Sequence, residues 1–121
     1  MASILIVDDD VEFRALLRAY LESDGHEVYE AVDGKEAALL YRVHLPDMVI
    51  TDIFMPEQDG LELIMELKVR FPVVKVIAMS GGSRGLAARP SLRMTRLLGA
   101  VQQLEKPFTK EQVLAAVHAL L

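Results

Sequence analysis

Short, nearly continuous apolar runs alternate with helix-forming stretches along this chain, and that alternation restricts its fold more than any other feature. The mostly apolar runs are residues 3–7, 48–51 and 75–79. Such runs are typical of strands that are buried on both faces of a parallel sheet. Residues 27–31 (EVYEA) and 101–104 (VQQL) are more polar and are also expected to be strands, the last of them a weaker one. Between the runs, apolar residues recur at helical spacing, as Phe13, Leu17 and Leu21 do. The pattern predicts a doubly wound α/β fold, in which right-handed crossovers place helices on both faces of a five-stranded parallel sheet.

The predicted helices begin at residues whose side chains can cap a helix. A Ser, Thr or Asp followed three residues later by Glu or Gln is a signature of a helix N-terminus. These pairs are Asp9 with Glu12, Asp33 with Glu36, Asp59 with Glu62 (before a helix expected from about Leu61 to Phe71), and Thr109 with Gln112. Gly25 is expected to end the first helix, and Pro46 limits the second. Glycine and proline in residues 81–90 weaken any helix, so the helix before the last strand is expected only at about residues 91–98.

Length and charge restrict the function as well as the fold. A chain of 121 residues predicts one domain, residues 1–121, with enough apolar mass for one core. Lys and Arg total 13 against 18 for Asp and Glu, and the net charge of −5 argues against direct nucleic-acid binding through phosphate contacts. The absence of cysteine excludes disulfides, thiolate metal sites and cysteine nucleophiles. The apolar runs are too short to span a membrane and no basic flank of a signal peptide is present, so the cytoplasm is the expected location.

Carboxylates follow two of the predicted strands. Asp8 and Asp9 follow the first strand, and Asp52 follows the third. In an open α/β sheet, ligands bind at the carboxyl ends of the strands, where the strand order reverses. If the order is 2-1-3-4-5, the first and third strands are neighbours and the three carboxylates converge in one crevice. Like charges so close together repel one another unless they share a cation, so the cluster predicts a Mg²⁺ site.

A serine and a lysine follow the last two predicted strands at the same edge. Lys106 supplies a positive charge that can pair with Asp52 at rest and with a phosphoryl oxygen afterwards. Ser80 supplies a hydroxyl donor. A carboxylate, a metal ion, an ammonium and a hydroxyl together suit phosphoryl transfer to a carboxylate. In this interpretation Asp52 is the nucleophile, and the other groups neutralise charge on the transferred phosphoryl group.

Four segments of the chain resemble the receiver domain of two-component response regulators. They are residues 4–10 (ILIVDDD), 49–56 (VITDIFMP), 77–80 (IAMS) and 104–108 (LEKPF), in order and at matching strand ends. The resemblance implies a flavodoxin-like or CheY-like fold. It also implies that Asp52 is the phosphoacceptor, Ser80 the switch hydroxyl and Lys106 the family's lysine. A histidine kinase or a phosphotransfer protein is then the expected donor.

The same resemblance implies a set of metal contacts. These come from Asp9, Asp52 and the backbone carbonyl of Phe54, with Asp8 acting largely through water. Asp10, the third aspartate of the run, is left to cap the first helix.

Departures from the family pattern bear on the expected switch. Gln103 stands where the family usually has Tyr or Phe, so the usual aromatic switch is absent. The stretch from Ser80 to Lys106 is a few residues longer than is typical, which makes ordering of residues 81–90 an alternative to rotation of a ring. Phe54 replaces a residue that is often polar and positions water, which predicts slow self-hydrolysis of the phosphorylated form. The resemblance further implies a cis peptide bond before Pro107.

Residues 81–98 contain four arginines and no acidic residue. A solvated helix face is the simpler interpretation of these cations, and a docking surface for an acidic downstream protein is the alternative. His26, His44 and His118 stand on separate predicted elements and lack the spacing of metal ligands. The sequence leaves open whether the domain acts alone or comes from a longer regulator.

Two other functions compete with that of a phosphorylated receiver. A Mg²⁺ phosphatase similar to the haloacid dehalogenase family would use Asp8 as nucleophile and Asp10 as general acid. Two residues argue against the phosphatase interpretation. Glu12 stands where that family needs Thr or Val, and Asp52 would have no role. A receiver-like interaction module that needs no phosphorylation agrees with Gln103 but does not explain the complete acidic set with Lys106.

Overall fold

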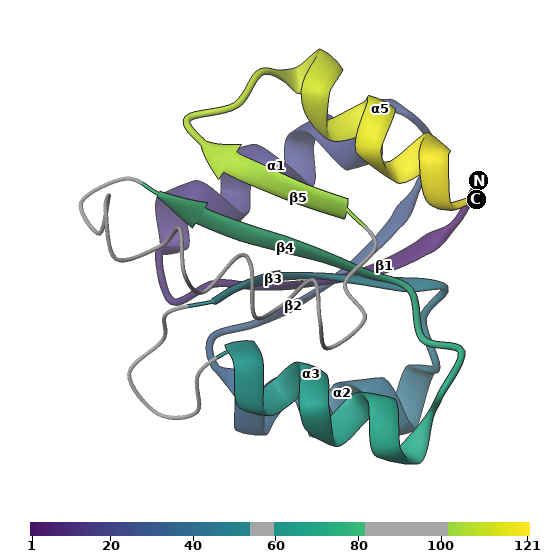
Figure 1. The fold of residues 1–121 in the computed structure, drawn as a ribbon. Helices are drawn as coiled ribbons and strands as arrows, with labels where there is room; N and C mark the ends of the chain where they lie inside the picture. Colours follow the sequence, from purple (N-terminus) through teal and green to yellow (C-terminus); the bar gives the residue numbers. More distant parts are fainter. Residues whose placement is uncertain (54–59, 82–101) are drawn as a thin grey trace.

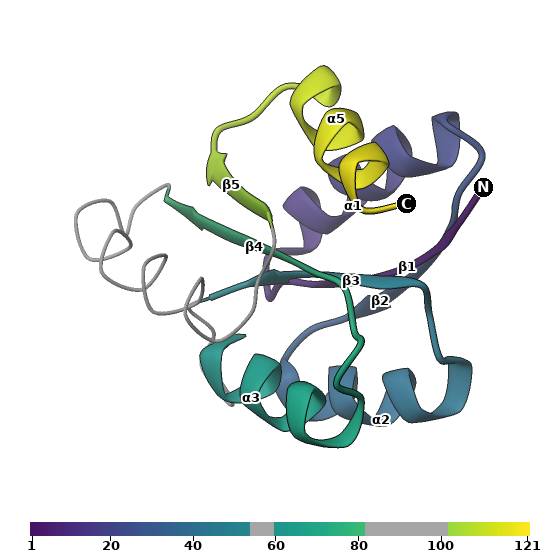
Figure 2. The same ribbon diagram turned by 45° about the vertical axis from the view of Figure 1, so that its right-hand side comes forward.

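A parallel sheet with helices on both faces makes up the described part of the chain (Figure 1). The computed structural model describes residues 1–53, 60–81 and 102–121. Its strands are β1 (Ser3–Val7), β2 (Glu27–Ala31), β3 (Met48–Asp52), β4 (Val76–Gly81) and β5 (Gln102–Lys106). Its helices are α1 (Val11–Ser23), α2 (Gly34–His44), α3 (Gly60–Arg70) and α5 (Lys110–Leu120). Helices α1 and α5 cover one face of the sheet, and α2 and α3 cover the other (Figures 1 and 2).

The strand order is β2-β1-β3-β4-β5, and every neighbouring pair is parallel. The predicted order is therefore confirmed. Strand β3 pairs with β4 as far as Asp52 with Met79, and β4 pairs with β5 as far as Gly81 with Lys106. The carboxyl ends of these strands consequently lie at one edge of the sheet, next to the end of β1.

Alternate residues of the strands point into two separate apolar layers. Leu5, Val49 and Ala78 lie in the layer that contains the buried faces of α2 and α3. Ile50 and Ile77 lie in the layer that contains the buried faces of α1 and α5. Burial of one such large aliphatic side chain contributes about 1.5–3 kcal/mol. Because both faces of the sheet are covered, the central strands β1, β3 and β4 are apolar along most of their length, which explains the apolar runs in the sequence. The edge strands β2 and β5 are more polar.

The described helix N-termini are capped as predicted at α2 and α5, but α1 is capped one residue later than its capping-box spacing predicted. Asp33 caps α2, and Thr109 with Gln112 forms a capping box at α5. At α1 the cap is Asp10, whose carboxylate accepts the backbone N–H three residues later at 3.1 Å. Asp10 has the extended backbone (φ −84°, ψ 110°) that this position requires. The predicted capping role of Asp9 is therefore wrong, and the role of Asp10 is confirmed.

Three strands extend past the ends that the sequence predicted. Strand β3 includes Asp52, β4 continues to Gly81, and β5 continues to Lys106. The apolar runs mark the buried part of each strand, whereas the ladder uses peptide groups and continues through the polar residues that follow. The peptide bond between Lys106 and Pro107 is cis, as the resemblance implied. Phe54, Asp59 and the helix expected at residues 91–98 lie outside the described residues.

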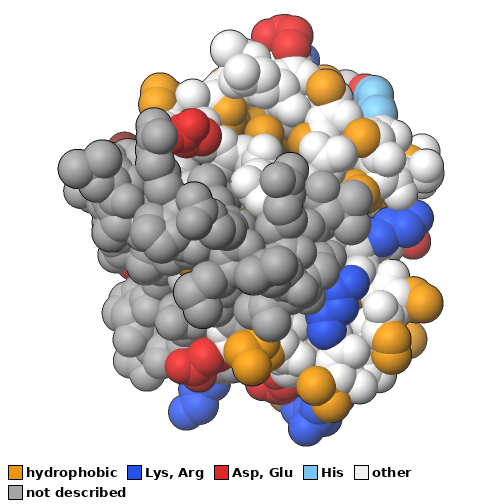
Figure 3. Space-filling view, viewed as in Figure 1, with side chains coloured by type: hydrophobic (Ala, Val, Ile, Leu, Met, Phe, Trp, Pro, Cys, Tyr) orange, Lys and Arg blue, Asp and Glu red, His pale blue; other side chains and the backbone are white. Residues whose placement is uncertain are grey.

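The outward faces of α2 and α3 carry exposed apolar side chains. Leu39 and Val43 on α2, and Met65 and Val69 on α3, are all more than half exposed. Apolar side chains are visible over this part of the surface, among acidic and basic ones, in Figure 3. Apolar residues in these two helices therefore do not all mark core positions. Within the described ranges, no helix combines the length and apolarity that crossing a bilayer requires.

Candidate functional site

Three carboxylates gather at the carboxyl edge of the sheet. Asp8 directly follows β1, Asp9 comes next in the chain, and Asp52 is the last residue of β3. Each offers a carboxylate oxygen, and these oxygens all lie within 4.8 Å of one another. Asp8 and Asp52 are buried, whereas Asp9 is exposed. The cluster expected from the strand order is present, and it combines two buried acids with one that is open to solvent.

The Lys106 ammonium lies between the two buried carboxylates. Its Nζ donates to Asp8 Oδ2 at 2.8 Å and to Asp52 Oδ2 at 3.1 Å. Burial alone would lower the pKa of Lys106, but the hydrogen bond to Asp8 and the charges of Asp52 and Asp8 outweigh it and raise that pKa. Lys106 therefore stays charged and offsets part of the repulsion in the cluster. The sequence predicted the pair with Asp52 but not the shorter contact with Asp8.

Asp8 is the most buried carboxylate of the cluster, with 1% of its surface exposed. Its Oδ1 accepts the backbone N–H of Asp10 at 3.0 Å. Burial raises the pKa of Asp8, and the charge of Asp52 adds to this, although the hydrogen bonds from Lys106 and Asp10 act in the opposite direction. The folded protein therefore binds a proton on the Asp8 carboxylate more tightly than the unfolded chain does. Ionisation of Asp8 consequently lowers the free energy of unfolding.

Asp8→Asn is expected to stabilise the domain at neutral pH when a chelator removes divalent ions. The pKa of Asp8 is raised in the folded state, so its stabilising contribution is lost as the pH rises through that pKa. Asn carries no charge, so the melting temperature of Asp8→Asn should exceed that of the wild type by the largest amount at neutral pH. The difference should disappear below pH 3.8, the pKa of Asp8 in the unfolded chain. Thermal melts of both proteins from about pH 3 to about pH 8 measure this difference. A variant that melts below the wild type at neutral pH would contradict the expectation.

Ser80 lies in β4 near the carboxyl edge and is 1% exposed. Among the residues that the structure describes, its Oγ is the buried side-chain polar atom without a hydrogen-bond partner. A buried hydroxyl without a hydrogen-bond partner lowers the free energy of unfolding by about 1–3 kcal/mol. Its backbone pairs with Glu105, one step before Gly81 pairs with Lys106. The hydroxyl is thus available to an oxygen acceptor that enters this edge of the sheet.

Ser80→Ala should leave the free energy of unfolding unchanged or raise it by up to about 1 kcal/mol, because no hydrogen bond is lost and an unpaired hydroxyl is removed. Chemical denaturation of the unphosphorylated proteins measures this. A loss of more than about 1 kcal/mol would show that Oγ has a partner at rest.

A buried arginine supports the backbone that carries Asp8. Arg14 on α1 is 8% exposed, and its guanidinium donates to the Asp8 carbonyl oxygen at 2.6 Å and to Glu30 Oε1 at 3.0 Å. These bonds connect the end of β1 to β2 through α1. The sequence analysis did not identify Arg14. Its burial could have been predicted from its helical spacing, because Arg14 stands three residues before Leu17 and seven before Leu21, on the buried face of α1.

Helix α3 begins in close contact with the backbone of Asp52. The N–H of Gly60 donates to the Ile53 carbonyl at 2.7 Å. A Cβ at Gly60 would lie 2.2 Å from the Asp52 carbonyl oxygen and 2.7 Å from Ile53 Cα. Only glycine permits this approach, which fixes the start of α3 against the strand end that carries Asp52.

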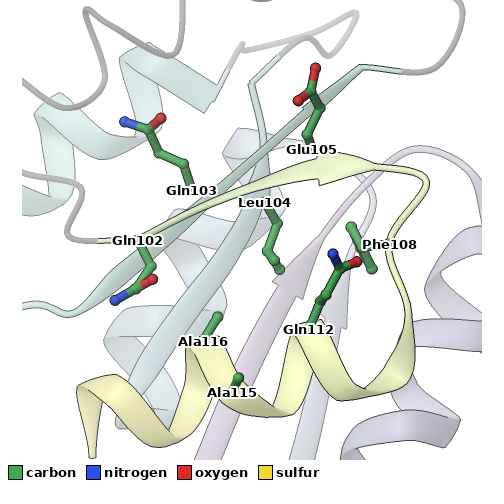
Figure 4. A pocket seen from close by; sticks show the side chains of 8 residues that line it. All are labelled: Gln102, Gln103, Leu104, Glu105, Phe108, Gln112, Ala115 and Ala116. Atoms are coloured by element: carbon green, nitrogen blue, oxygen red, sulfur yellow. The ribbon is translucent and has the colours of Figure 1, made fainter.

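A cavity of about 380 Å³ lies between β5 and α5 (Figure 4). It is lined by Gln102, Gln103, Leu104, Glu105, Phe108, Gln112, Ala115 and Ala116. Leu104 points toward α5, whereas Gln103 points to the opposite side of β5 (Figure 4). Because Gln103 carries an amide and no ring, this position offers no aromatic switch.

A second group of potential ligands lies away from the carboxyl edge. Asp24 Oδ2 accepts from His26 Nε2 at 2.8 Å and from His118 Nε2 at 2.7 Å. The hydrogen bond from His118, together with that from His26, lowers the pKa of Asp24 despite desolvation. The backbone N–H of Ala2 donates to His26 Nδ1 at 3.0 Å, so the proton of this ring is on Nε2. A metal ion would need the lone pair of His26 Nε2, which carries the proton. We therefore interpret the hydrogen bonds of Asp24 as a structural link between α5 and the turn that joins α1 to β2.

The structure thus brings Asp8, Asp9, Asp52 and Lys106 together, and it places Ser80 on the strand next to that of Asp52. Phe54 is outside the described residues. The approach of His26 to His118, whose ring centroids lie 6.3 Å apart, was not predicted, because the two residues are far apart in the sequence.

Comparison with known proteins adds independent information. A family model described as the response regulator receiver domain matches residues 4–118. The virulence transcriptional regulatory protein PhoP of Salmonella typhimurium is 34% identical over 124 residues, which cover 100% of this chain and 52% of that protein. The response regulator MprA of Mycolicibacterium vanbaalenii is 37% identical over 121 residues, which cover 98% of this chain and 49% of that protein. The chain spans about half the length of these curated relatives.

Two solved structures are similar to this chain over nearly their full length. The receiver domain of NtrX from Brucella abortus superimposes with a TM-score of 0.87 at 31% identity, covering 98% of this chain and 97% of that one. A chemotaxis protein of Vibrio cholerae superimposes with a TM-score of 0.89 at 26% identity, covering 100% of this chain and 99% of that one. The fold is therefore CheY-like, as the sequence predicted.

Proposed function

The chain belongs to the response regulator receiver domain family, and on that basis we propose that the carboxylate of Asp52 accepts a phosphoryl group from a histidine kinase or a phosphotransfer protein. The domain is a two-component signalling module and not an enzyme of the phosphatase type. The observation that carries the proposal is the setting of Asp52. It is a buried carboxylate that ends β3, lies 3.1 Å from the Lys106 ammonium, and belongs to the carboxylate cluster.

The residues around Asp52 suit the transfer of a phosphoryl group. An oxygen of Asp52 attacks the phosphorus of the donor, and the bond from phosphorus to the leaving group breaks as the new P–O bond forms. Lys106 keeps its proton and donates to a phosphoryl oxygen as negative charge accumulates there. The hydroxyl of Ser80, which has no partner at rest, donates to another phosphoryl oxygen.

We assign Mg²⁺ to the carboxylate cluster as part of the same proposal. The donor set fits a hard divalent ion, because its oxygens lie within 4.8 Å of one another and its carboxylates outnumber the nearby ammonium. Asp9 and Asp52 would hold the ion, Asp8 would act largely through water, and the Phe54 carbonyl is proposed as a further ligand. When bound, the ion neutralises charge on the phosphoryl oxygens.

Addition of Mg²⁺ is expected to raise the melting temperature of the domain. A ligand that binds only the folded state stabilises it by about 2.7 kcal/mol at a hundred times its dissociation constant. Asp9→Asn should reduce the shift, since it removes a carboxylate without emptying a buried position. Asp33→Asn is the matched control, because Asn caps α2 as well as Asp does and the position lies outside the cluster. An undiminished shift in Asp9→Asn would count against this site.

We further propose that residues 1–121 act as one receiver domain in the cytoplasm and signal to a downstream protein through protein contacts. The docking surface suggested for residues 81–98 falls almost entirely outside the described residues, so the proposal names no contact there.

The experiment is incubation with Mg²⁺ and acetyl phosphate, followed by measurement of the intact mass. We expect one phosphoryl adduct, which should not form when a chelator replaces Mg²⁺. If no small-molecule donor forms an adduct and beryllofluoride leaves the spectra of the protein unchanged, the domain is a phosphate-independent interaction module.

A further inference from the structure

An aromatic ring lies next to the Lys106 ammonium. The centroid of the Phe13 ring lies 4.1 Å from Lys106 Nζ. An ammonium has three N–H donors, and two of them are used by Asp8 at 2.8 Å and Asp52 at 3.1 Å. The negative face of an aromatic ring attracts a cation that lies within about 6 Å of its centroid. The Phe13 ring therefore attracts an ammonium that also donates to two carboxylates.

The position of the Phe13 ring is fixed by contacts that do not involve Asp52. Its backbone N–H donates to the capping Asp10 carboxylate at 3.1 Å, which places Phe13 in the first turn of α1. Its ring meets that of Phe108 edge-on, with centroids 5.4 Å apart and planes at 74°. Both rings pack against the apolar layer that α1 and α5 share. These contacts place the Phe13 ring at the end of the sheet where Lys106 lies.

We propose that Phe13 is a positioning residue for phosphoryl transfer, and that its ring keeps the Lys106 ammonium inside the site while Asp52 is converted to an acyl phosphate. This inference rests on the proposed role of Asp52. At rest two carboxylates attract Lys106, and one of them changes its charge and shape when the P–O bond forms. The attraction to the ring does not depend on that change, so Phe13 holds Lys106 in place before and after the transfer.

A ring that served packing alone would be replaceable by leucine, which fills a half-buried position without an aromatic face. The first comparison is therefore the rate of phosphorylation by acetyl phosphate at saturating Mg²⁺ in Phe13→Leu and Phe13→Tyr. We expect Phe13→Leu to react about 3- to 10-fold more slowly than the wild type, and Phe13→Tyr to stay within about 2-fold of it. Leu16→Ala, at an exposed position on the same helix, is the control and should match the wild type.

The second comparison asks whether Phe13 acts through Lys106. In a double-mutant cycle, Phe13→Leu should slow a protein that already carries Lys106→Ala by less than about 1.5-fold. The affinity for Mg²⁺ should not weaken in Phe13→Leu, because a phenyl ring offers the ion no oxygen ligand. A general loss of packing would lower both the Mg²⁺ affinity and the rate.

The third readout is independent of phosphorylation. Protons over the face of a ring resonate upfield, so the ε-methylene signals of Lys106 should be shifted in the wild type and should return toward ordinary positions in Phe13→Leu. Absence of the shift overturns the contact, and an equal slowing of Phe13→Leu and Phe13→Tyr overturns the role of the aromatic face. An unchanged rate in Phe13→Leu, or the same slowing in the Lys106→Ala background, overturns the positioning role. Failure of the wild type to accept any phosphoryl group refutes the proposed function, and the Lys106 signals then still decide the contact.

Discussion

Asp52→Asn is expected to abolish uptake of a phosphoryl group from acetyl phosphate while the fold is kept. An amide oxygen is a far weaker nucleophile than a carboxylate, so the acyl phosphate should not form at this position. The substitution also removes a charge that raises the pKa of buried Asp8, while the Asn oxygen can still accept from Lys106. The melting temperature without Mg²⁺ should therefore be no lower than that of the wild type.

Intact mass and a thermal melt test both parts of this expectation on the same sample. Asp33→Asn makes the same chemical change at a helix cap outside the carboxylate cluster, and it should take up phosphoryl groups like the wild type. An adduct on Asp52→Asn that forms as fast as on the wild type would place the acceptor elsewhere. Asp8 would then be the first alternative, since the phosphatase interpretation made it the nucleophile.

Gly60→Ala is expected to cause the largest loss of stability among the substitutions considered, about 3 kcal/mol or roughly 10 °C in melting temperature. Its Cβ would lie 2.2 Å from the Asp52 carbonyl oxygen. The clash involves backbone on both sides, so no side-chain rotation can relieve it, and either α3 or the end of β3 must move. Movement of that strand end should also slow phosphorylation at Asp52.

Gly25→Ala is the matched comparison for this prediction. Gly25 has a φ of +84°, so alanine is strained there, but a Cβ would meet nothing within 4 Å. The expected cost is about 1 kcal/mol, from backbone conformation alone. Chemical denaturation measures the free energy of unfolding of both variants. A larger loss in Gly25→Ala than in Gly60→Ala would contradict the claim that close packing of α3 against Asp52 requires glycine at position 60.

The fold was predictable because its main determinant is a local pattern. Continuous apolar runs such as Ile4 to Val7 reflect burial on both faces of a parallel sheet, and strand-forming segments alternate with helix-forming ones along the whole chain. The ends of the strands were less predictable, since Asp52 and Lys106 extend the ladder through peptide groups that the side-chain pattern does not report. The capping box suggested for Asp9 was wrong by one residue: Asp10 has the extended backbone of an N-cap, and its carboxylate accepts the backbone N–H of Phe13.

The candidate site was predictable to the extent that it follows from strand order. Once β1 and β3 are neighbours, Asp8, Asp9 and Asp52 must meet at one edge. Contacts between side chains of different elements were not predictable in this way. The buried Arg14 and the Phe13 ring over Lys106 depend on how α1 sits against the sheet, which the sequence pattern leaves undetermined.

Locating the residue that carries the phosphoryl group is the direct test of Asp52 as the phosphoacceptor. The wild type is incubated with Mg²⁺ and acetyl phosphate, reduced with borohydride to convert an aspartyl phosphate to homoserine, digested, and analysed by peptide mass. We expect homoserine at position 52 and at no other aspartate. Homoserine at position 8 or 9 with none at 52, or a phosphorylated protein without homoserine, would contradict the claim that Asp52 is the phosphoacceptor.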